Sequence, residues 1–256
     1  MPNYKRECIA IYRDEGVSEA SFSETLRSFR QCEAREGLAL RPMNARAVRT
    51  EPWESHCLMF VIPGGRSNPH YTLLGDEGMQ RIRDFVGAGG SFLGICGGGY
   101  FGATRTEFEV GGELEIVKPS GLCLSDFTAR GPAYGNGQYD YNSQAGSRLA
   151  TIQLNGFETD SARVYFNGGC FFEPQGEQVE TQVLARFDDI PGNPIAILSG
   201  SYGDGNYVLS GVHFEWGAFG LDGNDPFVRQ YHGELGQLEA ERQRVFEQVV
   251  ARLLGE

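Results

Sequence analysis

The sequence lacks the patterns that mark metal, membrane and nucleic-acid-binding proteins. Its six cysteines contain no C-x-x-C pair and no zinc-like spacing with the four histidines, so we expect no metal site. No apolar run approaches the length of a membrane span. The net charge is −12 without a basic stripe, so neither nucleic acid nor a membrane surface is an expected partner. The glycines at 97–99 meet neither the Walker nor the G-x-G-x-x-G spacing, which argues against a nucleotide loop. We expect no cofactor.

The amino-terminal segment also lacks the apolar stretch of a signal peptide and leads directly into a strand-like run. Cys8 and Cys57 lie in apolar runs, where cysteines in a reducing compartment behave as small buried hydrophobes. The chain has 256 residues, 40% of them hydrophobic, and shows no repeats or low-complexity tails. Such a chain can bury a full core. We expect a soluble, cytoplasmic protein.

The first part of the chain alternates strand-like and helix-like patterns. Ser21 and Glu24 have the spacing of a capping box at a helix start. Apolar residues recur at helical spacing after them and again over 77–86. Short apolar runs, typical of strands covered on both faces, occupy 8–12, 38–43, 57–62 and 91–95. The alternation predicts a mostly parallel sheet with helices on both sides, which is an α/β fold.

The sequence pattern changes between 113 and 210, where helical periodicity fades and glycine, proline, asparagine and aromatic residues become more frequent. Strands are predicted at 149–154, 162–166, 182–187, 195–198 and 207–212. We interpret this part as antiparallel strands added to the same sheet, so that 1–256 is a single domain. The segment 130–146 is predicted to be a long ordered loop near the functional site, and 235–254 a final helix.

The first candidate functional residue is Cys96, which ends the apolar run 91–95 and is followed by three glycines. Gly94 and Gly98 complete a G-x-C-x-G pattern at a turn from strand to helix. Such an elbow needs small neighbours because the backbone passes close to itself, and it exposes the central side chain. The helix start that follows favours a thiolate. Most cysteines in such proteins are structural, but this context predicts a nucleophile.

A thiol nucleophile needs a base and a group that orients the base. His213 ends the apolar run 207–212, and Glu215 points the same way two residues later if the backbone is extended. A lone histidine after a strand is more often structural. The H-x-E spacing together with the elbow cysteine predicts that His213 and Glu215 complete a triad. The other three histidines, His56, His70 and His232, have no partner at that spacing.

Two glycine-containing turns could complete the site. Pro63-Gly64-Gly65 follows a predicted strand beside the elbow, and the N–H groups of Gly65 and Gly97 could form an oxyanion hole. The alternative is an ordinary turn. The second turn, 167–170, follows Tyr165 and either lines the pocket or is a simple hairpin.

In this order, a P-G-G loop, a G-x-C-x-G elbow and a distant H-x-E resemble the class I glutamine amidotransferase-like superfamily. The sequence is still more similar to the amidotransferase-like amino-terminal region of eukaryotic biotin–protein ligases and to related stand-alone bacterial proteins. The resemblance runs from about residue 8 to 220 and is carried by 61–65, 89–102, 107–109, 165–169 and 213–215. It implies a flavodoxin-like three-layer sandwich, a Cys-His-Glu triad, and substrate contacts from Gly64, Tyr100, Tyr165, Asn167 and Gly168.

The sequence departs from the superfamily pattern at two positions. Tyr100 stands where working glutamine amidotransferases usually have a glutamine that helps to hold the substrate, and Phe214 replaces the proline of H-P-E. Nothing in the chain matches the biotin ligase catalytic domain. The sequence therefore predicts an amide hydrolase or transferase that acts on a small-molecule amide through a cysteine thioester. The alternatives are a non-catalytic binding or regulatory module linked to a biotin–protein ligase system, and ammonia delivery to a partner enzyme chain.

Overall fold

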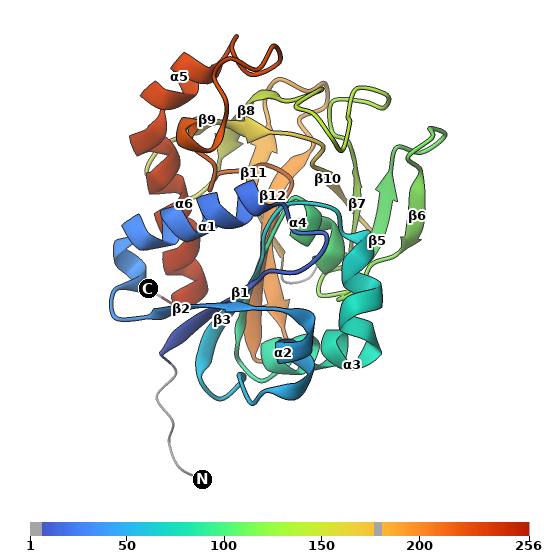
Figure 1. Cartoon of the computed structure of the whole chain (residues 1–256), viewed down its shortest axis with the longest axis vertical. Coiled ribbons are helices and arrows are strands. Elements are labelled where there is room, and N and C mark those ends of the chain that lie inside the picture. The colour runs from blue at the N-terminus through green and yellow to red at the C-terminus, as the bar shows by residue number, and fades with distance from the viewer. Residues whose placement is uncertain (1–6, 177–180, 256) are drawn as a thin grey trace.

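The computed structural model describes residues 7–176 and 181–255, and it confirms the α/β fold. A single sheet passes through the molecule, and helices cover it on both sides (Figure 1). Within the described residues the sheet has 13 strands, and one half is parallel while the other is mainly antiparallel.

The parallel half carries the strand order β2-β1-β3-β4-β13. This order corresponds to that of flavodoxin-like sheets, in which ligands bind beyond the carboxyl ends of the strands. All four neighbouring pairs in it are parallel. The strands are β1 (Cys8–Tyr12), β2 (Ala39–Met43), β3 (Cys57–Ile62), β4 (Ser91–Ile95) and β13 (Gly205–Ser210).

The other half extends the sheet from β13 through β12, β10, β7, β5 and β6, and a branch of β11, β8 and β9 leaves it at β12. Only the β5–β7 pair is parallel there. The bounds are β5 (Arg105–Phe108), β6 (Ile116–Pro119), β7 (Phe127–Gly131), β8 (Arg148–Leu154), β9 (Ser161–Phe166), β10 (Phe171–Pro174), β11 (Thr181–Phe187) and β12 (Ile195–Tyr202). The predicted added antiparallel strands are therefore confirmed, although β5, β6, β7 and β10 were not predicted.

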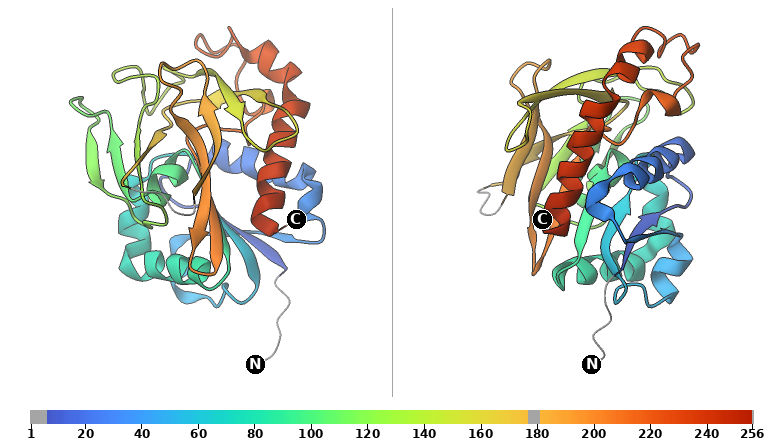
Figure 2. Two further views of the ribbon diagram at one scale, coloured as in Figure 1. Left: turned by 180° about the vertical axis from the view of Figure 1, so that it is seen from behind. Right: turned by 90° about the vertical axis from the view of Figure 1, so that its left-hand side faces the viewer.

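Two helix layers enclose the sheet. One face is covered by α1 (Glu19–Gln31) and α6 (Glu239–Leu254), which lie together in both views of Figure 2. The rings of Phe29 and Phe246 meet edge to face in this layer, with centroids 4.9 Å apart. The other face is covered by α2 (Ala45–Thr50) and α3 (Asn68–Gly87), with the short helix α4 (Gly97–Gly102) beside them. The remaining helices are α5 (His232–Gln237), η1 (Glu33–Arg35) and η2 (Ala218–Gly220).

Two predicted helix boundaries are wrong. The last helix is divided at Leu238 into α5 and α6, and α3 begins well before residue 77, with a kink at Gly75. The capping box is also wrong, because Ser18 caps α1 and its side chain accepts a hydrogen bond from Ser21 N. Ser21 and Glu24 therefore lie inside the helix, and both are buried against the protein interior.

The interpretation of Cys8 and Cys57 as unpaired buried cysteines is wrong as well. The two residues lie opposite each other on the parallel strands β1 and β3, with their Cα atoms 4.4 Å apart, and they form a disulfide. Adjacent strands bring two side chains of the same face within bonding range, which the separate apolar runs did not indicate. The other cysteines, Cys32, Cys96, Cys123 and Cys170, are free. No helix of the described residues is long and apolar enough to cross a membrane.

Candidate active site

Cys96 lies at a sharp turn between β4 and α4. Its backbone angles are φ 50° and ψ −103°, in a region that residues other than glycine rarely adopt. The turn is held by the neighbouring strand β13, because Cys96 N donates to Ser210 O at 2.8 Å. The flanking glycines are required: a Cβ at Gly94 would lie 2.4 Å from Gly98 O, and one at Gly98 would lie 2.1 Å from Ile62 O. The elbow inferred from G-x-C-x-G is therefore present.

The thiol of Cys96 lies at the carboxyl ends of the parallel strands. It is nearly buried, with 6% of the residue exposed, and its sulfur lies 3.7 Å from Asn167 O. Its position at the start of α4 adds unpaired N–H groups nearby, which stabilise negative charge. Among the described residues, no three His, Cys, Asp or Glu side chains gather as a metal site.

His213 follows β13 and is held by both its backbone and its ring. Its N–H donates to Tyr165 O at 2.9 Å, and its Nδ1 lies 2.7 Å from Glu215 Oε1. Both side chains are buried, with exposures of 3% and 0%. Because Nδ1 is engaged, Nε2 is the nitrogen left to face the thiol. The H-x-E spacing thus produces a buried imidazole–carboxylate pair.

The electrostatic surroundings favour a charged imidazole. Burial alone lowers the pKa of His213, but the charges of Glu215 and Cys96 and hydrogen bonds to both raise that pKa to about 10. A raised imidazole pKa makes His213 a stronger proton acceptor than a free histidine. Cys96, His213 and Glu215, predicted from distant stretches, therefore lie together.

The Pro63-Gly64-Gly65 loop packs against both the histidine and the elbow. A Cβ at Gly64 would lie 2.5 Å from His213 Cε1, and one at Gly97 would lie 2.4 Å from Gly65 O. The backbone of Ser18 donates to Gly64 O at 2.9 Å, which turns the Gly65 N–H away from that segment. No acceptor for the N–H of Gly65 or Gly97 occurs within 7–176 and 181–255. Both donors are therefore available to a ligand.

Sequence reasoning missed a link between this loop and the triad. The hydroxyl of Ser21, which is fully buried on α1, donates to Glu215 Oε1 at 3.2 Å and accepts from Gly64 N at 2.8 Å. One side chain thus contacts both the acid of the triad and the glycine loop. The only sequence signal was a serine on the buried face of an amphipathic helix, which also fits a helix cap.

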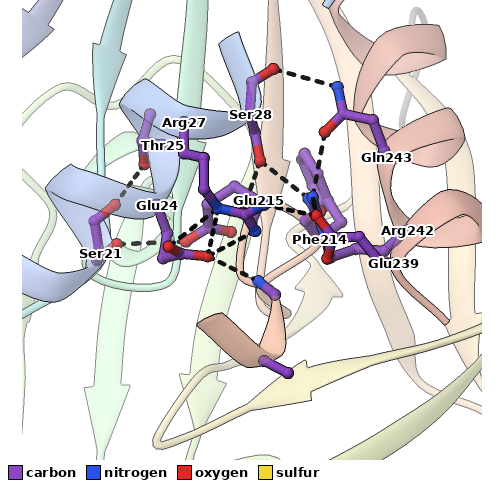
Figure 3. A network of polar contacts seen from close by, with 12 residues as sticks. Ser21, Glu24, Thr25, Arg27, Ser28, Phe214, Glu215, Glu239, Arg242 and Gln243 are labelled. Carbon is purple, nitrogen blue, oxygen red and sulfur yellow. Dashed lines mark hydrogen bonds and ion pairs between the residues drawn. The ribbon is translucent and has the colours of Figure 1, made fainter. Parts of the chain in front are cut away.

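The segment 213–217 is clamped from outside by α1 and α6 (Figure 3). The guanidinium of Arg242, 0% exposed, donates from Nη1 to Phe214 O at 2.8 Å, and Ser28 Oγ donates to Glu215 O at 2.8 Å. Gly217 N donates to Glu24 Oε2 at 2.9 Å. These contacts fix the backbone on which His213 and Glu215 are mounted.

Ion pairs connect the two helices behind that segment. Arg27 pairs with Glu24 at 2.8 Å and with Glu239 at 2.6 Å, and Arg242 pairs with Glu239 at 2.8 Å. Burial raises the pKa of Glu239, but hydrogen bonds from Arg242 and Arg27 outweigh it and lower that pKa to about 2. Glu239 is therefore charged throughout the neutral range.

Two chambers meet at Cys96. The polar chamber, about 260 Å³, contains His213, Asn167 and Gln144 in its wall. The apolar chamber has a similar volume and is lined by Tyr100, Phe108 and Ile116 among others. A thiol between two compartments can contact both halves of a bound molecule.

The two chambers share Tyr139 and Tyr141, which belong to the loop between β7 and β8. The loop is held at one side by Glu109, whose carboxylate accepts from Gly137 N at 2.8 Å. At the other side Gln144 accepts from Tyr165 Oη at 2.5 Å and from Asn167 Nδ2 at 3.3 Å. The loop predicted over 130–146 therefore lies at the site, although β7 includes its first two residues.

The predicted substrate-contact residues divide between the chambers. Tyr165, Asn167 and Gly64 line the polar chamber, whereas Tyr100 and Gly168 line the apolar one. Tyr100 Oη donates to Gly168 O at 3.1 Å, and burial raises the pKa of Tyr100 well above its ordinary value. The turn at 167–170 is not a hairpin, because β9 pairs with β8 while β10 pairs with β7 and β12.

His56, His70 and His232 line neither chamber. His232 opens α5, and its Nε2 lies 3.0 Å from Ala218 O. His70 is fully buried on α3, with its ring edge-on to Tyr12 and Phe101, and burial lowers its pKa to about 4. His213 is therefore the histidine that lies in the chamber wall beside Cys96.

The fold and this site define an α/β protein with a nucleophile-type elbow at the carboxyl edge of a parallel sheet. The chain matches the family described as "Biotin-protein ligase, N terminal" over residues 8–254. It is 37% identical over 210 residues to an uncharacterised protein of Chlamydia muridarum (strain MoPn / Nigg), covering 81% of this chain and 80% of that one. The chain therefore belongs to the biotin–protein ligase amino-terminal family, as the sequence motifs predicted.

A longer relative places this family within a larger enzyme. The biotin–protein ligase of Schizosaccharomyces pombe (strain 972 / ATCC 24843) is 31% identical over 228 residues, which are 86% of this chain but 36% of that protein. The chain thus spans about a third of that relative. Among solved structures, a cytoplasmic protein of Salmonella typhimurium LT2 shares the fold with a TM-score of 0.53 and 15% identity, over 96% of this chain and 99% of that one. A ThuA-like protein of Bacteroides uniformis has a TM-score of 0.50 and 11% identity, over 96% and 94%.

Proposed function

We propose that the protein is an amide hydrolase or amidotransferase that acts through a thioester on Cys96. The observation that supports this most is the buried His213–Glu215 pair beside an elbow cysteine of positive φ. A nucleophile, a base and a group that orients the base are the three parts that covalent acyl transfer requires.

The proposed reaction begins with the Cys96 thiolate and a protonated His213. The sulfur attacks the amide carbon, and the N–H groups of Gly65 and Gly97 bind the oxygen as it becomes negative. The C–N bond then breaks, and His213 gives its proton to the nitrogen, which leaves as an amine or ammonia. His213 next takes a proton from water, whose oxygen attacks the thioester. The carbon–sulfur bond breaks, which releases the carboxylic acid and restores the thiolate–imidazolium pair.

Selective alkylation tests the activated state of the cysteine. We expect iodoacetamide at pH 7 to modify Cys96 faster than Cys123, which is exposed and free. Peptide mass spectrometry at short times measures the two rates within one sample. Cys96 reacting no faster than Cys123 would contradict an activated thiolate.

Trapping tests turnover itself. The intact chain is incubated with a set of primary amides, and ammonia release and the mass of an acyl-enzyme are measured, with hydroxylamine added to cleave any thioester. Cys96→Ser should abolish both signals, and Cys123→Ser should leave them unchanged. Ammonia release that persists in Cys96→Ser would exclude the proposed route.

The second candidate function is a non-catalytic small-molecule-binding or regulatory module, linked to a biotin–protein ligase or another partner chain. Tyr100 supports it, because its buried ring occupies the position of the glutamine found in the amidotransferases that the sequence resembles. The relationship to the longer S. pombe ligase also supports it. Thermal-shift measurements with biotin, glutamine and small amides distinguish the two. Stabilisation that survives Cys96→Ala, without product release by the parent chain, favours the binding module.

A further inference from the structure

The two chambers beside Cys96 are not equivalent with respect to His213. The imidazole lies in the wall of the polar chamber and is absent from the wall of the apolar chamber. In the proposed hydrolysis this imidazole must give its proton to the departing nitrogen, so that nitrogen has to lie on the imidazole side of the sulfur. The acyl group is attached to the other side of the same carbon. It therefore extends into the apolar chamber.

The polar chamber offers a suitable partner for an amine. Asn167 Oδ1 is buried, and no hydrogen-bond donor reaches it from the described residues. An unpaired buried acceptor is costly unless a ligand supplies a donor. The backbone carbonyl oxygen of Asn167 lies 3.7 Å from the Cys96 sulfur. The side-chain acceptor Oδ1 of the same residue therefore belongs to the immediate surroundings of the reacting bond. The N–H of a departing amine or of ammonia would satisfy it.

The wall of the apolar chamber instead presents aromatic rings and aliphatic carbon to a ligand. Tyr100 and Phe108 meet edge to face at 5.8 Å, and Phe108 and Tyr139 meet at 5.5 Å. Two hydroxyls of this wall are engaged within the protein: Tyr100 Oη donates to Gly168 O, and Thr106 Oγ1 contacts Ser120 Oγ at 2.9 Å. The exposed Arg66 lies in the wall of both chambers, so it does not distinguish one from the other. Against these rings and engaged hydroxyls, a polar acyl group would lose hydrogen bonds to water without regaining them.

We propose that the acyl part of the substrate is an apolar chain or an aromatic ring bound in the apolar chamber, and that the amine leaves through the polar chamber. This assignment rests on the proposed hydrolase function for the direction of the substrate. Each chamber holds about 260 Å³, and the two together reach the range of ordinary small-molecule sites. The substrate class is then an amide of a hydrophobic carboxylic acid with ammonia or a small polar amine.

Neighbouring residues of the edge strand β6 provide a matched pair for the test. Ile116 lines the apolar chamber, whereas Val117 is 43% exposed on the opposite face. With the intact chain, we expect ammonia release from phenylacetamide to exceed that from acetamide at least about tenfold in kcat/KM. Ile116→Glu should reduce the phenylacetamide value at least about tenfold more than it reduces the acetamide value. Val117→Glu should change neither, and Ile116→Gln replaces Ile116→Glu if the latter does not fold.

A binding measurement separates failure of this assignment from failure of the hydrolase function. In Cys96→Ala, calorimetric titration should detect phenylacetate but not acetate, and Ile116→Glu should abolish the phenylacetate signal. If this binding occurs while the parent chain releases no ammonia from any amide, the hydrolase proposal fails and the apolar ligand site remains. If acetamide and phenylacetamide react equally well and Ile116→Glu affects neither, the acyl assignment is overturned and the hydrolase function remains.

Discussion

Replacing Arg242 with methionine tests whether the helices α1 and α6 hold the candidate triad in place. Methionine keeps much of the aliphatic volume but removes the hydrogen bonds to Phe214 O and Glu239 and the charge. Breaking a buried ion pair by removing one partner typically costs roughly 3–5 kcal/mol. Glu239 is 35% exposed and keeps Arg27 as a partner, so part of that cost is avoided. We expect a loss of about 3 kcal/mol in the free energy of unfolding.

The matched control is Arg244→Met on the same helix. Arg244 is exposed, and its Nε donates a hydrogen bond to Ala240 O of the same helix at 3.3 Å. Its replacement should change the free energy of unfolding by less than about 0.5 kcal/mol. Urea unfolding measures both variants, and a shift of the midpoint without a change in slope identifies a stability effect.

The same two variants distinguish a general stabilising role from a role in positioning the site. Phe214 stands between His213 and Glu215, so loss of the bond to its carbonyl should loosen the imidazole–carboxylate pair. We expect iodoacetamide to alkylate Cys96 more slowly in Arg242→Met than in Arg244→Met under conditions where both are folded. Equal unfolding free energies and equal alkylation rates for the two variants would refute the reasoning.

Three further predictions concern residues around the same pair. Ser21→Ala removes one partner of Glu215 and of Gly64 N, and we expect a loss of roughly 1–3 kcal/mol and slower Cys96 alkylation, with exposed Ser23→Ala as the control; equal values for both would contradict the link. Gly64→Ala would bring a Cβ to 2.5 Å from His213 Cε1, so amide turnover should fall at least about tenfold, whereas Gly233→Ala, whose Cβ meets nothing within 4 Å, should not change it. His70 has a pKa of about 4 in the folded protein, below its ordinary 6.5, so the unfolded chain binds the proton first as the pH falls and stability is lost between about pH 6.5 and 4. That loss in the free energy of unfolding should reach about 2 kcal/mol at pH 5 and be absent in His70→Phe, as measured by urea unfolding at pH 7 and 5. The same pH dependence in the parent chain and in His70→Phe would contradict this prediction.

The parts of the fold that the sequence predicted are those set by local patterns. Strand β3 was predicted at its observed bounds because its six residues are almost all apolar, as a strand covered on both faces requires. The elbow was predictable because steric crowding leaves glycine as the only residue at two positions around Cys96. The four unpredicted strands were missed because three have only four residues and all lack a continuous apolar run, so their pairing depends on distant neighbours.

The parts of the site that were not predicted depend on contacts between distant segments. Ser21 approaches Glu215 across 194 positions of sequence, and no local pattern records that approach. The wall formed by Tyr139 and Tyr141 depends on how a long loop folds back on the sheet. The disulfide between Cys8 and Cys57 likewise depends on the register of two strands that are separated in the sequence by α1, η1, β2 and α2. Sequence spacing therefore pointed to Cys96, His213 and Glu215, which the structure brings together, more readily than to the residues that surround them.

The clamp on the His213–Glu215 segment has a consequence for the order in which the protein matures on the ribosome. Arg242 lies on α6, so it is synthesised after every residue of the candidate triad and of both chambers. Because chains begin to fold from the amino terminus during synthesis, the sheet can form while the loop bearing the imidazole still lacks its anchor. The nascent chain would then carry a thiol whose partner is not yet held in place, and reactivity would arise only when the last helix docks.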